Sequence, residues 1–159
     1  MCMNKYGDQD METPSLSVNL KHKGGSVVLG KTRNHKVMID RPKVKGGNDE
    51  GPMGGEFLLF GLGGCFFSTL LGAYKADYDD YPDEPIEIMV GGTLVSGPAR
   101  FSTFAISVYA SFRLKEKLAK ALLKAERGCI VHNTLKSVAP VSFQYNWVDP
   151  QVFPSLITA

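Results

Sequence analysis

The chain has too few cysteines for a disulfide-stabilised scaffold. Its 159 residues include three, Cys2, Cys65 and Cys129, whereas such scaffolds use a larger, even number. The first twelve residues also lack the apolar stretch of a secretory signal. We therefore expect a cytoplasmic protein with reduced thiols, in which a disulfide would be transient and catalytic rather than structural.

An excess of charge of either sign is also missing. There are 18 lysines and arginines against 16 aspartates and glutamates, and the formal net charge is +2. The lysines are scattered, and the sequence lacks the long basic runs that favour binding to nucleic acid or to an anionic membrane. We expect neither partner.

Common catalytic and cofactor motifs are absent from the sequence. It contains no phosphate-binding glycine loop, no dinucleotide-binding fingerprint and no nucleophilic serine elbow. Its three histidines, His22, His35 and His132, lack the paired short spacings that zinc sites use. We expect no cofactor and no bound metal.

One long apolar segment is present, between Phe57 and Tyr74. Its length is close to that of a membrane span, but small and polar residues interrupt it: Gly61, Gly63, Gly64, Ser68, Thr69 and Gly72. A helix that is apolar on every side is buried in lipid or in protein. Because the rest of the chain predicts soluble β-structure, we favour protein and expect a buried helix over about 55–76.

Alternating apolar and polar residues predict strands on both sides of this helix. The strands are expected near 16–20, 26–29, 35–39, 86–94, 104–112 and 141–147, with Gly91-Gly92 as a bulge. A glycine- and proline-rich loop fills 40–54. An amphipathic helix is expected over 114–125, with Gly128 in the left-handed position beyond its end, followed by a short helical segment over 129–136.

This order of elements predicts one α+β domain over residues 13–159, with mainly antiparallel sheet, after a disordered tail over 1–12. One small sheet covers only one side of an apolar helix. The small residues Gly61, Gly64, Ser68 and Gly72 share one face at helical spacing and would let another element approach closely. We therefore expect a partner subunit to complete the enclosure.

Cys65 and Cys129 would form a redox-active dithiol if the fold brings them together. A thiol reacts as its thiolate, and burial of Cys65 among apolar neighbours would raise its pKa unless a cation or a hydrogen-bond donor faces it. Arg33 is our first candidate for that cation and Arg41 our second, since they flank the strand predicted at 35–39. The alternative for each is a solvated charge at a strand end.

Glu56 opens the long helix and has two interpretations. It is either a first-turn carboxylate favoured by the helix dipole or an active-site carboxylate that orients an arginine. It lies nine residues before Cys65, so the two point to opposite sides of a regular helix, about 13 Å apart along its axis. Contact between them would need a break in the helix, an intermediate side chain or a partner subunit.

Cys129 is followed by His132, three residues further on. In a helical turn the two would be neighbours, and the start of a short helix there would lower the pKa of the thiol. The alternative is that Cys129 is a small buried residue that only packs.

The chain resembles the osmotically inducible protein C (OsmC) family, which includes the organic hydroperoxide resistance proteins. Three segments carry the resemblance: Gly46-Gly47-Asn48-Asp49-Glu50-Gly51-Pro52, the run from Glu56 to Cys65 that ends in Gly63-Gly64-Cys65, and Gly128-Cys129-Ile130-Val131-His132-Asn133-Thr134-Leu135. It implies an intertwined homodimer in which antiparallel sheets wrap around central helices. The chain departs from the family pattern at two positions. Ile130 stands where many members have proline, and Gly55 stands where the hydroperoxide branch has its catalytic carboxylate.

The resemblance also implies site residues and an activity. Cys65 would be the thiolate that attacks an organic hydroperoxide, Cys129 the thiol that closes a disulfide with it, and a dithiol reductant would restore the pair. Arg33 and Glu56 would complete the catalytic set. We weigh this cytosolic peroxidase against a binding protein for a small apolar or thiol-bearing ligand, and against a structural dimer whose cysteines only pack.

Overall fold

The computed structural model describes residues 15–153, and the chain divides into two compact units at Met53/Gly54. The expected tail over 1–12, with Cys2, lies outside the described residues. The N-terminal unit is a three-stranded antiparallel sheet in the order β1-β2-β3, formed by β1 (Asn19–Gly24), β2 (Val27–Thr32) and β3 (His35–Ile39). A short 3-10 turn, η1 (Lys43–Lys45), follows it.

Two tight turns and one buried carboxylate define this unit. Gly24 and Gly25 have positive φ in the first turn, and Arg33 has φ 50 in the second. Asp40, only 2% exposed, accepts hydrogen bonds from the Ser26 hydroxyl and from the backbone N–H groups of Arg41, Asn48 and Glu50. These bonds fold the glycine-rich loop back onto the end of β3.

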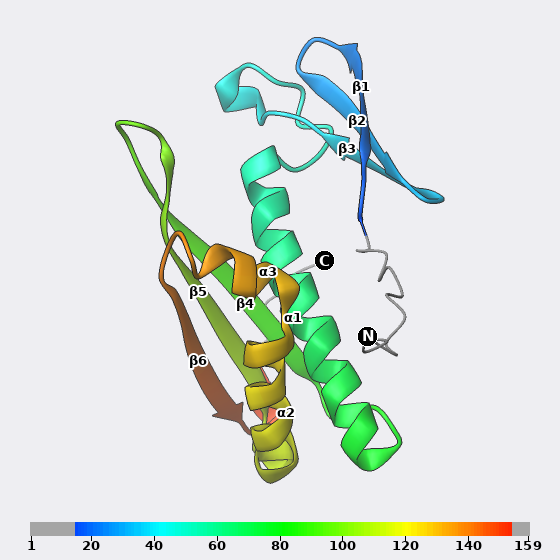
Figure 1. The fold of residues 1–159 in the computed structure, drawn as a ribbon, viewed down its shortest axis with the longest axis vertical. Coiled ribbons are helices and arrows are strands. Elements are labelled where there is room, and N and C mark those ends of the chain that lie inside the picture. Colours follow the sequence, from blue (N-terminus) through cyan, green and yellow to red (C-terminus); the bar gives the residue numbers. More distant parts are fainter. Residues whose placement is uncertain (1–14, 154–159) are drawn as a thin grey trace, which may run out of the picture. The chain divides into compact units, whose positions relative to one another are not determined.

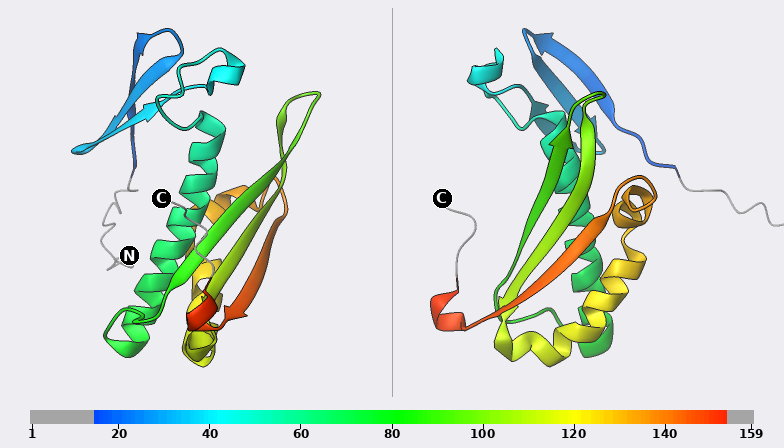
Figure 2. Two further views of the ribbon diagram at one scale, coloured as in Figure 1. Left: turned by 180° about the vertical axis from the view of Figure 1, so that it is seen from behind. Right: turned by 90° about the vertical axis from the view of Figure 1, so that its left-hand side faces the viewer.

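The C-terminal unit places helices on one face of a second sheet (Figure 1). Its elements in chain order are α1 (Gly54–Tyr78), β4 (Ile86–Val95), β5 (Arg100–Ser111), η2 (Phe112–Leu114), α2 (Lys115–Gly128), α3 (Ile130–Leu135), β6 (Val141–Val148) and η3 (Pro150–Val152). The strand order is β4-β5-β6, with β4 antiparallel to β5 and β6 parallel to β5. The crossover through α2 and α3 makes the parallel pairing possible, as Figure 2 shows.

The hydrophobic core lies between α1, α2 and the central strand β5. Between Leu62 and Tyr74 every fourth residue of α1 is buried: Leu62, Phe66, Leu70 and Tyr74. Phe104, Ile106, Val108 and Ala110 come from β5, and Leu118, Ala121, Leu122 and Ala125 from α2. The alternation in β5 and the helical spacing in α2 are the patterns on which the sequence predictions rested.

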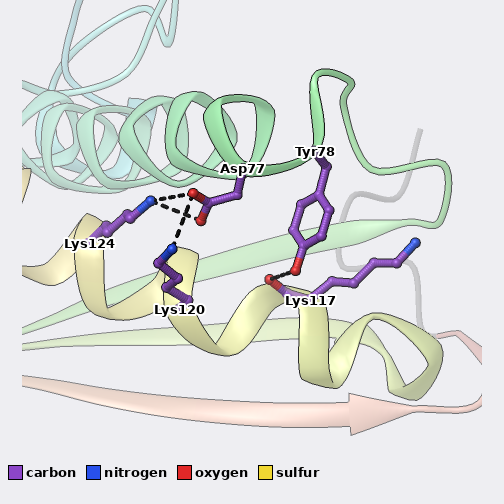
Figure 3. A network of polar contacts seen from close by, with 5 residues as sticks. All are labelled: Asp77, Tyr78, Lys117, Lys120 and Lys124. Atoms are coloured by element: carbon purple, nitrogen blue, oxygen red, sulfur yellow. Dashed lines mark hydrogen bonds and ion pairs between the residues drawn. The ribbon is translucent and has the colours of Figure 1, made fainter.

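Polar contacts fasten the C-terminal end of α1 to α2 (Figure 3). Asp77 accepts from Lys124 at 2.7 and 2.8 Å and from Lys120 at 3.4 Å. The Tyr78 hydroxyl donates to the Lys117 carbonyl at 3.5 Å. The hydrogen bond from Lys124 lowers the pKa of Asp77, which keeps the carboxylate ionised between the two lysines.

The α+β fold and the long apolar helix are confirmed, but several details differ from the predictions. The first strand begins at Asn19 rather than Leu16, which is 96% exposed. The shift in strand register lies between Thr93 and Leu94 rather than at Gly91-Gly92. Phe112 belongs to η2 and is exposed, not part of the apolar strand face.

The prediction for Gly128 was also wrong. It is the last residue of α2 and is not among the glycines with positive φ. A Cβ atom there would lie 3.2 Å from Cγ2 of Thr69 in α1. Gly128 therefore marks a close approach between the two helices rather than a left-handed turn.

Candidate active site

Cys65 and Cys129 come from different helical segments and meet at the contact between α1 and α3. Cys65 lies in the middle of α1 and is half-buried, whereas Cys129 is fully buried. The Cys129 side chain hydrogen-bonds with that of Cys65. Both thiols are free. The structure thus brings together two sulfur atoms that the sequence separates by 64 positions.

Hydrogen-bond donors make Cys65 the more acidic thiol. Burial by itself raises its pKa, but hydrogen bonds from the Val131 backbone, the Cys129 side chain and the Ile130 backbone outweigh burial and lower it. The Thr69 hydroxyl lies close as well, yet it donates to the Cys65 carbonyl at 2.8 Å, and one hydroxyl proton serves one acceptor. The donors named here are uncharged, so a basic partner is not needed to lower this pKa.

Cys129 has the opposite character. Burial raises its pKa, and the neighbouring Cys65 raises it further, while the His132 backbone N–H acts against both. Cys129 is the N-cap of α3, with φ −70 and ψ 115, and its Sγ accepts from the His132 backbone N–H at 3.4 Å. This arrangement favours ionisation of Cys65 ahead of Cys129, so that the Cys65 thiolate accepts a hydrogen bond from the protonated Cys129 thiol.

His132 is adjacent to Cys129, but its ring turns away from the sulfur. Nδ1 lies 2.7 Å from the Glu126 carbonyl oxygen, and the ring meets Phe143 edge-on at 5.0 Å. The expected influence of His132 on the thiol is therefore exerted by its backbone amide.

Glu56 lies in the exposed first turn of α1. The helix runs without interruption from Gly54 to Tyr78, so it contains no break that would bring Glu56 to Cys65. A catalytic role for Glu56 would need an intermediate side chain or a second subunit, and the role stays a prediction.

Arg33 and Arg41 both belong to the N-terminal unit. Arg33 lies in the turn between β2 and β3, and Arg41 follows β3. A role for either arginine in facing the thiolate stays a prediction. Within residues 15–153 the structure contains no group of three or more histidine, cysteine, aspartate or glutamate side chains that would hold a metal ion.

The amide donors at the start of α3 are the functional groups that sequence reasoning missed. Side-chain patterns do not reveal backbone N–H groups. A signal was nevertheless present, since a cysteine immediately before a short helical segment places the first amides of that segment close to its neighbours.

The fold, with its paired thiols of unequal acidity, defines a class of small α+β proteins with a dithiol between two helices. A family model described as OsmC-like protein matches residues 46–144, which is more than half of the chain. The chain belongs to the OsmC-like family. None of the curated protein sequences matches it significantly.

Solved structures share the fold at low sequence identity. An OsmC-like protein from Mycoplasma pneumoniae is 17% identical with a TM-score of 0.67, covering 87% of this chain and 99% of its own. An organic hydroperoxide resistance protein from Elizabethkingia anophelis, with thiocyanate bound, is 19% identical with a TM-score of 0.60, covering 87% and 100%. A Vibrio cholerae structure with captopril in one of its active sites is 17% identical with a TM-score of 0.62, covering 89% and 99%.

Among the described residues, α1 is long and apolar enough to cross a membrane by length and composition alone. Its buried face packs into the core of the C-terminal unit. Of its most apolar 18-residue window, 28% is buried within the chain, so much of its surface lacks cover from the single chain.

Proposed function

We propose that the protein is a thiol-dependent peroxidase that reduces organic hydroperoxides. The observation that carries the proposal is the asymmetry of the thiol pair: Cys65 has a lowered pKa and is partly exposed, while Cys129 is buried with a raised pKa. A peroxidase of this type needs one thiolate that reacts first and a second thiol that waits in the protonated form.

The reaction begins at Cys65. Its thiolate attacks the distal oxygen of the hydroperoxide, the O–O bond breaks, and the alkoxide takes up a proton and leaves as an alcohol. Cys65 becomes a sulfenic acid. The Cys129 sulfur then attacks the Cys65 sulfur, an S–S bond replaces the S–O bond, and the Cys129 proton leaves with the hydroxide as water. A dithiol reductant returns both thiols by exchange and becomes a disulfide itself.

Apolar neighbours favour an organic substrate over hydrogen peroxide. Cys65 packs with the hydrophobic core, where Leu62 and Phe66 are fully buried and Val131 and Phe67 are partly buried. Surfaces of this kind favour alkyl or fatty-acyl groups, since contact with them removes apolar area from water.

We propose a homodimer as the working form. Among the described residues of the C-terminal unit, nothing beyond the neighbouring residues and backbone of α1 itself lies within 4 Å of the Cβ positions at Gly61, Gly64 and Gly72. Phe60, on the exposed side of the same helix, is 64% exposed. Small residues on one face allow close approach of a second helix, and a second copy of the chain would supply it. In such a dimer Glu56 and Arg33 would complete the catalytic set.

A second candidate function is small-molecule binding at the same thiol pair without turnover. The Vibrio cholerae structure with captopril in one of its active sites favours it, because it shows that a similar fold accommodates a compound of that size. The two candidates differ in whether the thiols change oxidation state.

The deciding experiment counts free thiols after reaction with cumene hydroperoxide. A Cys2→Ser background leaves only the two thiols of interest. We expect loss of both thiols in this background, loss of one in Cys129→Ser, and no loss in Cys65→Ser. Intact thiols at stoichiometric hydroperoxide would contradict the peroxidase. If native mass spectrometry then shows a retained compound, the binding function is supported instead.

A further inference from the structure

His132 joins three contacts at the turn between α2 and α3. Its Nδ1 lies 2.7 Å from the Glu126 carbonyl oxygen. A carbonyl only accepts, so Nδ1 carries the proton. The backbone N–H of the same residue donates to Cys129 Sγ at 3.4 Å. The ring edge meets Phe143 at 88°, and the residue is 9% exposed.

Two side chains of strand β6 contact this turn. The Tyr145 hydroxyl donates to the Glu126 carboxylate. Burial and Glu126 together raise the pKa of Tyr145, so the phenol remains a donor. Phe143 is also on β6. The carbonyl that holds the imidazole therefore belongs to an anchored residue, and the ring itself packs against the same strand.

A second side chain makes an equivalent contact one residue along. Asn133 Nδ2 donates to the Arg127 carbonyl at 2.8 Å, with the same six-residue separation as His132 and Glu126. Both bonds satisfy backbone carbonyls in the last turn of α2, where carbonyl groups have no N–H donor within the helix. Only His132 also contacts the sulfur of Cys129, which singles it out from Asn133.

We propose that His132 is a positioning residue for disulfide closure: its imidazole holds the α2–α3 turn so that its backbone N–H supports the Cys129 sulfur during attack on Cys65. This inference deepens the proposed function and rests on it for the physiological step. In that step negative charge builds on the Cys129 sulfur as its proton departs, and a donor aimed at that sulfur stabilises the charge.

The closure step can be observed without a hydroperoxide. In the Cys2→Ser background, the Cys65 thiolate reacts with 5,5′-dithiobis(2-nitrobenzoate), releases one thionitrobenzoate and forms a mixed disulfide. Cys129 then attacks the Cys65 sulfur, the mixed disulfide breaks, and a second thionitrobenzoate and a proton leave. The rate of the second release, which is independent of reagent concentration, measures closure.

Two substitutions at position 132 form a matched pair. His132→Leu and His132→Asn both remove the ring contact with Phe143, but only asparagine keeps a donor for the Glu126 carbonyl, as Asn133 shows for Arg127. We expect the leucine variant to close about three- to tenfold more slowly than the parent, in line with one lost hydrogen bond. The asparagine variant should close within about twofold of the parent.

Two outcomes would overturn the inference. One is equal slowing in both variants, because lost packing alone would then explain the slowing. The other is unchanged closure in the leucine variant. Asn133→Ala is the control. It removes a hydrogen bond of the same turn, but this bond does not involve His132, and we expect closure to slow no more than twofold. Slowing as large as in His132→Leu would also overturn the inference.

If His132→Leu does not fold, Tyr145→Phe replaces it, since this change keeps the ring and removes only the anchor of Glu126. We expect about two- to threefold slower closure in that variant, and an unchanged rate would count against the role of His132. No step of this assay uses a hydroperoxide, so the two proposals can fail separately. If the protein is inert to cumene hydroperoxide but the leucine and asparagine variants still differ in closure rate, the peroxidase proposal is refuted and this inference stands.

Discussion

The two units of the chain are ordered by different means. The C-terminal unit contains the whole hydrophobic core cluster, with Leu62, Phe66 and Leu70 fully buried. Among the described residues of the N-terminal unit the buried side chains are Val27 and Asp40, while Leu20 is 63% exposed. One unit is held by packing and the other by strand pairing and a hydrogen-bonded carboxylate. The difference shows that the hydrophobic core and the thiol pair can both lie in one part of a chain, while another part is ordered without a core.

The largest expected effect comes from removing a core ring in the C-terminal unit. Phe66→Ala should lower the free energy of unfolding by about 3–5 kcal/mol, since Phe66 is fully buried and stacks on Phe143 at 5.3 Å. Leu20→Ala is the matched change in the other unit and should alter it by less than about 0.5 kcal/mol. Urea denaturation followed by far-UV circular dichroism measures both.

Protein concentration sharpens this comparison. A cost of Leu20→Ala that shrinks on dilution would mean that a second subunit covers the sheet of the N-terminal unit, because a subunit contact contributes most at high protein concentration. A cost equal to that of Phe66→Ala at every concentration would contradict the contrast between the units.

Acid should affect the N-terminal unit through Asp40. The hydrogen bond from Ser26, together with those from the backbone of Glu50, Arg41 and Asn48, lowers its pKa from 3.8 to about 2 despite burial. Because the folded-state pKa is the lower one, the stabilisation is fully present above about pH 4 and is lost as pH falls towards 2. The hydrogen-exchange protection factors of the loop over 41–50, which are corrected for the pH dependence of intrinsic exchange, should fall in that range.

Asp40→Asn provides the control for the acid experiment. The variant should have lower protection factors than the parent at neutral pH, and these should change little further between pH 4 and pH 2. A parent whose loop exchanges with the same pH dependence as the variant would show that another group governs this loop.

The smallest expected effect is local to the thiol pair. Ile130→Pro removes one donor to Cys65, so the pKa of that thiol should rise and its alkylation by iodoacetamide at neutral pH should slow severalfold. The fold should tolerate the change, because proline suits the first position of a helix and the ψ of 115 at Cys129 suits the residue before proline.

Ile130→Ala keeps the amide and is the matched control, with alkylation expected at the parent rate. Arg33→Ala and Arg41→Ala test whether an arginine of the N-terminal unit stabilises the Cys65 thiolate instead. If an arginine variant slows alkylation and Ile130→Pro does not, the amides of the C-terminal unit are not the main donors.

The sequence predicted the secondary structure well where periodicity is strong. The alternation of Ile106, Val108 and Ala110 and the apolar run of α1 each predicted one element that the structure confirms. The parallel pairing of β6 was not predictable, since alternation specifies which face a side chain occupies but not the direction of the neighbouring strand.

The candidate site was only partly predictable. The sequence indicated both cysteines, because each lies in a distinctive local motif. It did not indicate that the amides of Ile130 and Val131 would serve as donors, since backbone groups acquire a role only through tertiary contact. From the sequence, either a cation or a hydrogen-bond donor could face Cys65, but side-chain patterns offered candidates only for the cation.

Gly128 shows how a missing side chain can set a separation. It lies immediately before Cys129 and faces Thr69, which is one helical turn beyond Cys65. A methyl group here would lie tight against the Thr69 side chain, at the place where the sulfur-bearing segments converge. The glycine thus keeps the two segments in close contact, and a larger residue that displaced Thr69 would act on the reach of a future S–S bond without touching either thiol.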